Sequence, residues 1–475
     1  MTIVTPSAGE TNAPPTAGGA TNPEALVAKL RATFDAGRTR PVSWRRNQLE
    51  RLDAMLVAFE AEFTAVLGEE LGKSPIEAYT TEIGFVRAEI AYALKHLDEW
   101  TSITRRKVPL KLGGGKGYTV PDPLGVVLII APWNYPMHLA IAPLVGAIAA
   151  GNTAIVKPSE VTPKTSALIA QALPEYLDPD AFAVVEGGVG ETTALLEQRF
   201  DHIFYTGNGV VGRIVMAAAA KHLTPVTLEL GGKSPAIVDR RANVRIAARR
   251  IAWGKWTNAG QTCVAPDYVL VDDAVKDQFL AELASAVTEF FGPDPQQSVD
   301  FGRIVDDRHF ARLSAYLTDG TVFLGGSTDA ATRYIAPTVL VDVPDDAPVM
   351  QEEIFGPILP VFGVPSLHAA VERVKAGDKP LALYVFSEDS TATEQVLRET
   401  SSGGACVNAT LMHLGAPELP FGGVGESGMG AYHGKEGFDV FSHAKAVFDR
   451  PTRPDPSLSY PPYTKRKAWF LRKLF

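Results

Sequence analysis

The amino-acid sequence predicts an α/β protein with a doubly wound parallel sheet, a second α/β domain and a projecting hairpin. Three observations carry this prediction. Short β-branched runs alternate with helical segments between residues 125 and 232, a second alternation follows them, and one polar, glycine-rich stretch stands apart from both. Such alternation is typical of a parallel sheet covered by helices on both faces.

The chain before the first sheet is predicted to be helical. Residues 23–103 are mostly amphipathic, for example over 25–37 and 47–72, where apolar residues recur at helical spacing. Residues 1–22 are rich in Pro, Gly, Thr and Ala, and they lack the basic and apolar regions of a secretion signal. We therefore expect a flexible leader there.

The first sheet is predicted from five strand-like runs, with helical segments between them. The runs are residues 125–130, 152–157, 181–186, 202–206 and 226–230. The stretch from 125 to 156 is apolar enough to resemble a membrane span, but three prolines interrupt it, so we interpret it as buried strand, loop and helix.

The second domain is predicted from strands over 234–239, 267–272, 336–343 and 381–387, with helices over 277–291 and 367–377. The projecting hairpin, residues 104–121, has a Gly-rich tip and is too polar for either core, so we expect it to pair with another subunit. The tail, 456–475, mixes five basic residues with Trp, Phe and Leu. We expect it to dock on its own protein, with an anionic membrane surface as the alternative.

Composition excludes several classes of protein. The 475 residues are 46% apolar and 21% charged, which is typical of a folded globular protein, and the net charge of −9 argues against nucleic acid as a partner. Only two cysteines occur, so a disulfide framework is excluded, and the thiols fit a reducing, cytoplasmic compartment. The nine His and two Cys show no metal-ligand spacing, so we expect no metal.

Reactive side chains at the carboxyl ends of the predicted strands are the first site candidates, because ligands of open α/β sheets bind there. The second strand ends at Lys157, and Glu160 follows Pro158. This pair would place an ammonium and a carboxylate near a nucleotide ribose or phosphate. A plain helix start with an acidic first turn explains the same residues.

A literal G-x-G-x-x-G, from Gly207 to Gly212, follows the strand that ends at Thr206. Glycines in this context let the backbone approach a pyrophosphate. Glu229 lies about 20 residues further on, where it could hold a ribose, but it also ends a strand, where it could serve as a general base. Spacing alone leaves both roles open.

Cys263 is a candidate nucleophile because it lies among small polar residues after a helix, rather than on an apolar stripe. An inert core residue is the simpler interpretation of an arbitrary cysteine, and we keep it for Cys406. Asn134, next to Trp133 at the end of the first strand, offers an amide donor, although a turn asparagine is the plainer explanation.

Taken together, these residues resemble the NAD(P)-dependent aldehyde dehydrogenases. Six motifs in the family's order carry the resemblance: Pro132-Trp133-Asn134, Val156-Lys157-Pro158-Ser159-Glu160, Glu229-Leu230-Gly231-Gly232-Lys233, Gly260-Gln261-Thr262-Cys263, Glu353-Ile354-Phe355-Gly356-Pro357 and Pro420-Phe421-Gly422-Gly423. Stretches such as GQTCVAPDY are most similar to the class 3 branch. That branch is typically dimeric and oxidises medium-chain, fatty or aromatic aldehydes.

The resemblance implies a role for each candidate. Cys263 would be the nucleophile, Glu229 the general base and Asn134 an oxyanion donor. The cofactor, NAD or NADP, would contact Lys157, Glu160, Thr206, Gly207, Gly212, Glu353, Phe355 and Trp133.

The resemblance also implies a division of the chain. Residues 23–103 and 122–230 would form the NAD(P)-binding domain and 231–430 the catalytic domain, with 104–121 and 431–455 as oligomerisation and bridging segments. The expected activity is oxidation of an aldehyde to the carboxylic acid through a thioester on Cys263, in a homodimer. Two alternatives keep the scaffold: an acylating enzyme that passes the thioester to coenzyme A or phosphate, and a noncatalytic binding protein. Glu229 argues against the acylating enzyme, because a general base for water is needed only if water is the acceptor. The presence of Asn134, Glu229 and Cys263 together argues against the noncatalytic protein.

Overall fold

The computed structural model describes residues 22–109, 112, 114–455 and 457–474. The predicted leader lies outside the described residues except for Asn22. The Asn22 side chain accepts hydrogen bonds from the amides of Glu24 and Ala25, so it caps the first helix.

The segment before the first sheet is helical, as predicted. Its elements are α1 (Pro23–Asp35), α2 (Val42–Ala58), α3 (Glu60–Leu71), α4 (Pro75–Ala78), the π-helical turn η1 (Tyr79–Ile83) and α5 (Gly84–Trp100). The amphipathic pattern over 47–72 does not form one rod, because α2 ends before Phe59 and α3 begins after it.

The first sheet contains all five predicted strands, in the parallel order β7-β6-β3-β4-β5. They are β3 (Val126–Ile130), β4 (Thr153–Lys157), β5 (Phe182–Val184), β6 (His202–Thr206) and β7 (Val226–Glu229), with α6 (His138–Ala150), α7 (Pro163–Tyr176), α8 (Val189–Leu196) and α9 (Gly209–Ala220) between them. The chain reverses its direction of winding between β3 and β6. The crevice beyond the carboxyl ends of these two strands is where such a sheet binds ligands.

The second sheet is also mainly parallel, in the order β10-β13-β14-β9-β8-β15-β16. Its strands are β8 (Pro235–Val238), β9 (Tyr268–Asp272), β10 (Thr321–Leu324), β13 (Thr338–Val341), β14 (Ile358–Val364), β15 (Ala382–Phe386) and β16 (Gly404–Val407); its helices are α10 (Val244–Trp256), α11 (Lys276–Phe291), α12 (Asp307–Ala315), α13 (Pro348–Gln351), α14 (Leu367–Ala376) and α15 (Ser390–Glu399). The shorter elements are η3 (Thr257–Gly260), η4 (Pro295–Gln297), η5 (Tyr316–Thr318), η6 (Met412–Gly415), β11 (Thr328–Asp329) and β12 (Tyr334–Ile335).

One strand joins the two halves of the chain. After the second sheet is complete, β17 (Gly428–Met429) returns to the first sheet and pairs antiparallel with β7, with Gly428 opposite Glu229. The end of β7 is therefore covered by backbone from the second half of the chain.

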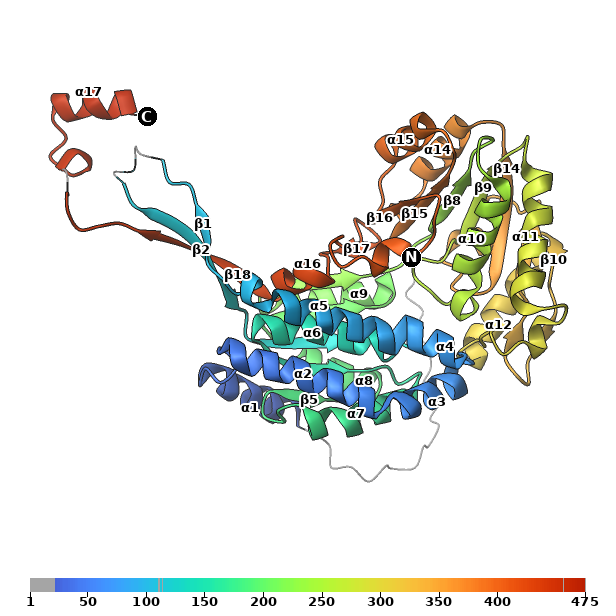
Figure 1. The fold of residues 1–475 in the computed structure, drawn as a ribbon, viewed down its shortest axis with the longest axis horizontal. Helices are drawn as coiled ribbons and strands as arrows, with labels where there is room; N and C mark the ends of the chain where they lie inside the picture. The colour runs from blue at the N-terminus through green and yellow to red at the C-terminus, as the bar shows by residue number, and fades with distance from the viewer. Residues whose placement is uncertain (1–21, 110–111, 113, 456, 475) are drawn as a thin grey trace, which may run out of the picture.

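The predicted hairpin forms an arm that leaves the body (Figure 1). Strand β1 (Thr104–Arg106) pairs antiparallel with β2 (Lys116–Pro123), and β18 (Ser442–Asp449), which follows α16 (Gly434–Val440), pairs along the whole of β2. The chain then continues through η7 (Ser457–Ser459) to α17 (Lys465–Leu474), which lies at the far end of the arm.

The expectation that the tail docks on its own chain is wrong for this single chain. Helix α17 has no buried residue, and Trp469 and Phe470 are exposed. Its side-chain contacts are local: Lys473 lies over the Trp469 ring, and the Lys467 ammonium donates to the Tyr460 carbonyl. The physical reason is the arm, which holds the tail away from both sheets (Figure 1).

The apolar stretch from 125 to 156 is buried strand, loop and helix, as interpreted from its prolines. No helix in the described part of the chain has the length and apolar character needed to cross a bilayer.

Candidate functional site

Cys263 lies on the loop between α10 and β9. Three consecutive residues with left-handed backbone conformation precede it in this loop. Asn258, Ala259 and Gly260 have φ angles of 52°, 51° and 77°. At Gly260 an added Cβ would lie 2.2 Å from the carbonyl oxygen of Gly356, so only glycine fits there. The turn leaves the Cys263 side chain partly exposed.

Asn134 follows β3 and is bonded to the cysteine loop. Its Nδ2 donates to the Gln261 carbonyl over 3.0 Å, and the neighbouring Tyr135 hydroxyl lies 2.6 Å from the Thr262 Oγ1. The Asn134 side-chain amide has a second N–H, which can donate to a reacting carbonyl oxygen. Two segments 127 residues apart therefore meet where the predicted nucleophile lies.

Glu229 ends β7 and is only 2% exposed. Neither carboxylate oxygen has a hydrogen-bond partner among the described residues. Burial raises the pKa of this carboxyl well above its ordinary value. A buried carboxyl with no competing partner is suited to accept a proton from water, which is the chemistry of a general base.

Glu353 places a second carboxyl near Cys263 and Glu229. Its side chain packs against Gly231, where an added Cβ would lie 2.0 Å from the Glu353 Oε2. Burial raises the pKa of Glu353 to about 8. The pKa of the Cys263 thiol is also raised, first by burial and then by the carboxylates of Glu353 and Glu229. The thiol and both carboxyls therefore share one electrostatic environment.

Thr206 ends β6 and Gly207 follows it, so both lie at the carboxyl end of the strand next to β3. Thr206 pairs with Glu229 across β6 and β7, and its buried Oγ1 has no partner among the described residues. Gly212 lies inside α9 against Leu230, where an added Cβ would be 3.0 Å from the leucine side chain. The lack of a side chain at Gly212 therefore lets α9 pack closely on the sheet.

Lys157 and Glu160 form a separate group at the carboxyl end of β4. Lys157 is 2% exposed, its Nζ donates to the Pro158 carbonyl over 2.7 Å, and it lies 3.5 Å from the Glu160 Oε2. Burial lowers the pKa of Lys157. Glu160 remains half-exposed at the rim.

Trp133 and Phe355 come together from different domains. Their ring centroids are 5.3 Å apart with an edge-to-face angle of 81°, and Trp133 also contacts the His309 ring. Phe355 has a φ of 52°, an unusual conformation for a bulky residue. This aromatic contact lies two residues from Glu353 and next to Asn134.

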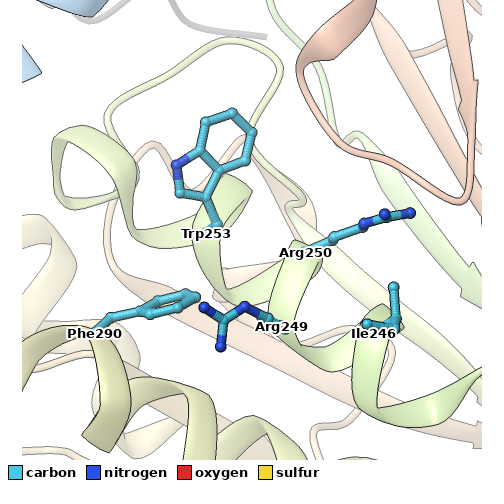
Figure 2. A pocket seen from close by; sticks show the side chains of 5 residues that line it. All are labelled: Ile246, Arg249, Arg250, Trp253 and Phe290. Atoms are coloured by element: carbon cyan, nitrogen blue, oxygen red, sulfur yellow. The ribbon is translucent and has the colours of Figure 1, made fainter.

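A hollow of about 370 Å³ on α10 and α11 contains none of these residues (Figure 2). Its lining is Ile246, Arg249, Arg250, Trp253 and Phe290. Arg249 forms an ion pair with Glu289, and Arg250 donates to the Asn408 carbonyl, so both guanidinium groups have partners. In the described ranges, no three His, Cys, Asp or Glu side chains could together hold a metal ion.

Cys406 differs from Cys263 in its surroundings. Its Sγ lies 3.2 Å from the His413 Nδ1. Burial raises the pKa of the Cys406 thiol and lowers the pKa of His413 to about 4, so both groups are neutral at physiological pH. The pKa of both thiols is raised, so the difference between them is access: Cys406 is buried, whereas Cys263 is partly exposed.

Sequence reasoning missed Lys255, which is completely buried near Glu353 with no hydrogen-bond partner for its Nζ in the described chain. Burial lowers the pKa of Lys255 to about 8. The sequence held one signal: Lys255 falls on the apolar face of α10, at helical spacing from Ile251 and Ala252.

Comparison with known proteins identifies the family of the chain. Residues 1–447 match the Aldehyde dehydrogenase family. The chain is 49% identical to rat aldehyde dehydrogenase family 3 member A2, over 95% of each chain. It is 48% identical to the dimeric NADP-preferring aldehyde dehydrogenase of the dog, over 92% of this chain and 97% of that one. A solved structure of Staphylococcus aureus AldH in a substrate-bound state is 47% identical, with a TM-score of 0.93, and the match covers 95% of this chain and 99% of that one.

The residues present fit a dinucleotide. The β3–β6 crevice offers the Thr206 hydroxyl, which is buried and has no partner among the described residues, and α9 begins just after it at Gly209, so helix N-terminal amides lie close to the same strand end. The chain therefore belongs to the aldehyde dehydrogenase family, most similar to its class 3 branch, and is an NAD(P)-dependent oxidoreductase that acts on aldehydes.

Proposed function

We propose that the enzyme converts its aldehyde to the free carboxylic acid through a covalent intermediate on Cys263. The observation that carries the proposal is the meeting of Cys263, Asn134 and Glu229 at one place, with no partner competing for the Glu229 carboxyl among the described residues.

The first half of the reaction forms the thioester. The Cys263 thiol loses its proton to solvent water, the thiolate sulfur bonds to the aldehyde carbon, and the carbonyl electrons move to the oxygen. The Asn134 side-chain amide and the Cys263 backbone N–H donate to this oxyanion, and one such donor is typically worth about 3 to 4 kcal/mol. NAD(P) supplies the acceptor for the hydride that leaves the carbon. The carbon–oxygen double bond then re-forms as a thioester.

The second half releases the acid. Glu229 takes a proton from water, the hydroxide adds to the thioester carbon, and the carbon–sulfur bond breaks. The sulfur leaves as thiolate and takes up the proton that Glu229 removed from water, which restores the Glu229 carboxylate. Glu229 acts in its ionised form, which the raised pKa makes a stronger base, and the carboxyl must lose its own proton before this step.

The cofactor is proposed to lie along the crevice from β4 to the cysteine loop. Lys157 and Glu160 would hold the adenosine ribose, and Thr206 and Gly207 would line the middle, with Gly212 letting α9 pack close to the sheet beside them. Glu353 would hold the nicotinamide ribose, with Phe355 and Trp133 packed beside it. The half-exposed Glu160 carboxylate would repel a 2′-phosphate, whereas its partner Lys157 would attract one.

The substrate is proposed to be a medium- or long-chain aliphatic aldehyde or an aromatic one. The similarity to class 3 relatives supports this substrate class. We expect hexanal, decanal and benzaldehyde to give a higher kcat/KM than acetaldehyde. A preference for acetaldehyde would contradict this assignment.

We further propose a homodimer in the cytoplasm. The outer edge of β18 carries no partner strand in the described single chain and is largely exposed, and both cysteines are unpaired thiols. One similar protein is named dimeric. Light scattering of the purified protein should give twice the chain mass, and a monomer at micromolar concentration would contradict the arm's proposed role.

The test of the proposed function uses Cys263→Ala, with Cys406→Ala as its matched control. We expect Cys263→Ala to lose aldehyde-dependent reduction of NAD(P) while its cofactor affinity stays within about twofold, and Cys406→Ala to remain active. The wild-type product should be the free acid even when coenzyme A is present. Activity in Cys263→Ala, or accumulation of acyl-CoA, would overturn the proposal.

A further inference from the structure

A fully buried ion pair lies behind the proposed oxyanion donor and has no part in the mechanism above. Lys73 follows α3, and Glu82 lies in the π-helical turn η1; both side chains are 0% exposed, and the Lys73 ammonium donates to the Glu82 Oε1. Removing two charges from water is costly, so such a pair requires further partners to be tolerated.

Each member of the pair bonds to the segment that carries Asn134. Lys73 donates to the Asn134 backbone carbonyl over 3.1 Å, and its ammonium lies 4.1 Å from the centre of the Tyr135 ring. The Glu82 Oε2 accepts from the amides of Met137 and His138, each over 3.0 Å. These amides begin α6, which has no side-chain cap from its own N-cap residue, so Glu82 satisfies that end of the helix.

The same segment is bonded onward to the cysteine loop. The Asn258 Nδ2 donates to both the Asn134 carbonyl and the Gln261 carbonyl, over 2.8 and 3.1 Å, and the Asn258 amide donates to Glu77 over 2.7 Å. The backbone of Asn134 is therefore fixed by Lys73 on one side and by the left-handed turn before Cys263 on the other.

We propose that the Lys73–Glu82 pair is a positioning element of the active site, which fixes the Asn134 backbone so that its side-chain amide is aimed at the carbonyl oxygen of an aldehyde bound to Cys263. The inference rests on the proposed function and deepens it. The pair acts through Asn134, so its loss slows thiol addition and hydride release while leaving the cofactor site, on β4 and β6, intact. A displacement of the donor by even a fraction of an ångström weakens a hydrogen bond that matters in the transition state.

The test variant is Lys73→Met/Glu82→Gln. Breaking a buried pair by removing one partner is strongly destabilising, whereas replacing both charges is often tolerated. The side-chain amide oxygen that the second substitution introduces can still accept from the start of α6, so the helix keeps its cap. The matched control is Arg45→Met, which removes another buried cation that donates to backbone carbonyls, those of Thr39 and Ala149, at the opposite end of α6.

The readout is the burst of NAD(P)H in the first turnover, measured with folded protein whose unfolding temperature has been checked. We expect the double variant to lose at least about tenfold in burst rate with cofactor affinity within about twofold, and Arg45→Met to keep its burst rate. In an Asn134→Ala background, the double replacement should cause no further loss, because the side chain it positions is absent.

Two results would overturn the positioning role. One is an unchanged burst rate in the folded double variant; the other is an equal loss in the Asn134→Ala background, which would mean a general structural effect. If the double variant does not fold, Lys73→Gln/Glu82→Gln, which also leaves no buried charge, is compared with Asn134→Ala in the same cycle, with the same two criteria. Failure of the proposed function is distinct, because it would appear as activity in Cys263→Ala.

Discussion

Replacing Glu229 by Gln should lower kcat strongly and yet make the folded protein more stable as the pH rises above the ordinary pKa of a glutamate carboxyl. The carboxyl is buried without partners among the described residues, and its pKa is raised well above the ordinary 4.5. Between 4.5 and the raised value, the native state holds a proton that the unfolded chain has lost. Stability is therefore lost as pH rises through this window, and Gln, which cannot ionise, removes that loss.

The size of the effect follows from linkage. One proton of difference changes the free energy of unfolding by at most about 1.4 kcal/mol per pH unit, so the advantage of the variant should grow at up to this rate as the pH rises from 4.5 towards the raised pKa. Loss of the general base should at the same time lower kcat by about 10² to 10⁴.

The assay is urea unfolding of wild type and Glu229→Gln at several pH values, together with steady-state rates. The exposed Glu197 supplies a matched control, Glu197→Gln, in which neither quantity should change appreciably. A Glu229→Gln variant that is less stable than wild type at every pH, or a stability difference that does not vary with pH, would refute the reasoning.

The remaining predictions concern the donor, the cofactor and the buried lysine. Asn134→Ala should lower the burst rate by about 10² to 10³, whereas Asn152→Ala, which removes a buried amide bonded to the Phe441 carbonyl, should leave it unchanged; equal losses would contradict the assignment. Glu160→Gln should raise the ratio of kcat/KM for NADP over NAD by about tenfold, because one negative charge is removed; an unchanged ratio would remove Glu160 from the ribose site. For Lys255, the native pKa of about 8 lies below the unfolded value of 10.5, so between these pH values the unfolded chain binds a proton that the native protein lacks. The free energy of unfolding of wild type, relative to that of Lys255→Met, should therefore increase as the pH rises from 8 to 10.5. A difference in urea unfolding that does not change with pH would show that the Lys255 amine is solvated.

Much of the fold could be predicted because local patterns decide it. The five β-branched runs of the first sheet became its five parallel strands, and the polar 104–121 stretch became a hairpin. Strand β14 was not predicted, since Pro360 and Gly363 interrupt its apolar run, and both residues are unfavourable within strands. The tail was placed wrongly because its amphipathic composition does not reveal how far the arm carries it from the body.

The site was predictable only in part. Cys263, Glu229 and Asn134 lie in short motifs at strand ends and loops, where sequence reasoning looks for reactive groups. Lys73 and Glu82 have no such signal, because each is an ordinary charged residue in a helical region, and their burial depends on α6 arriving from elsewhere in the chain. Buried polar networks assembled from distant segments leave no local pattern in the sequence.

The most direct measurement of the central claim is to identify the atom that carries the substrate during turnover. Glu229→Gln, mixed with NAD(P) and decanal and quenched within the first turnover, should gain the mass of one decanoyl group, and peptide mapping should place that group on Cys263. An unmodified protein after a full burst of NAD(P)H, or an adduct on Cys406, would contradict the account.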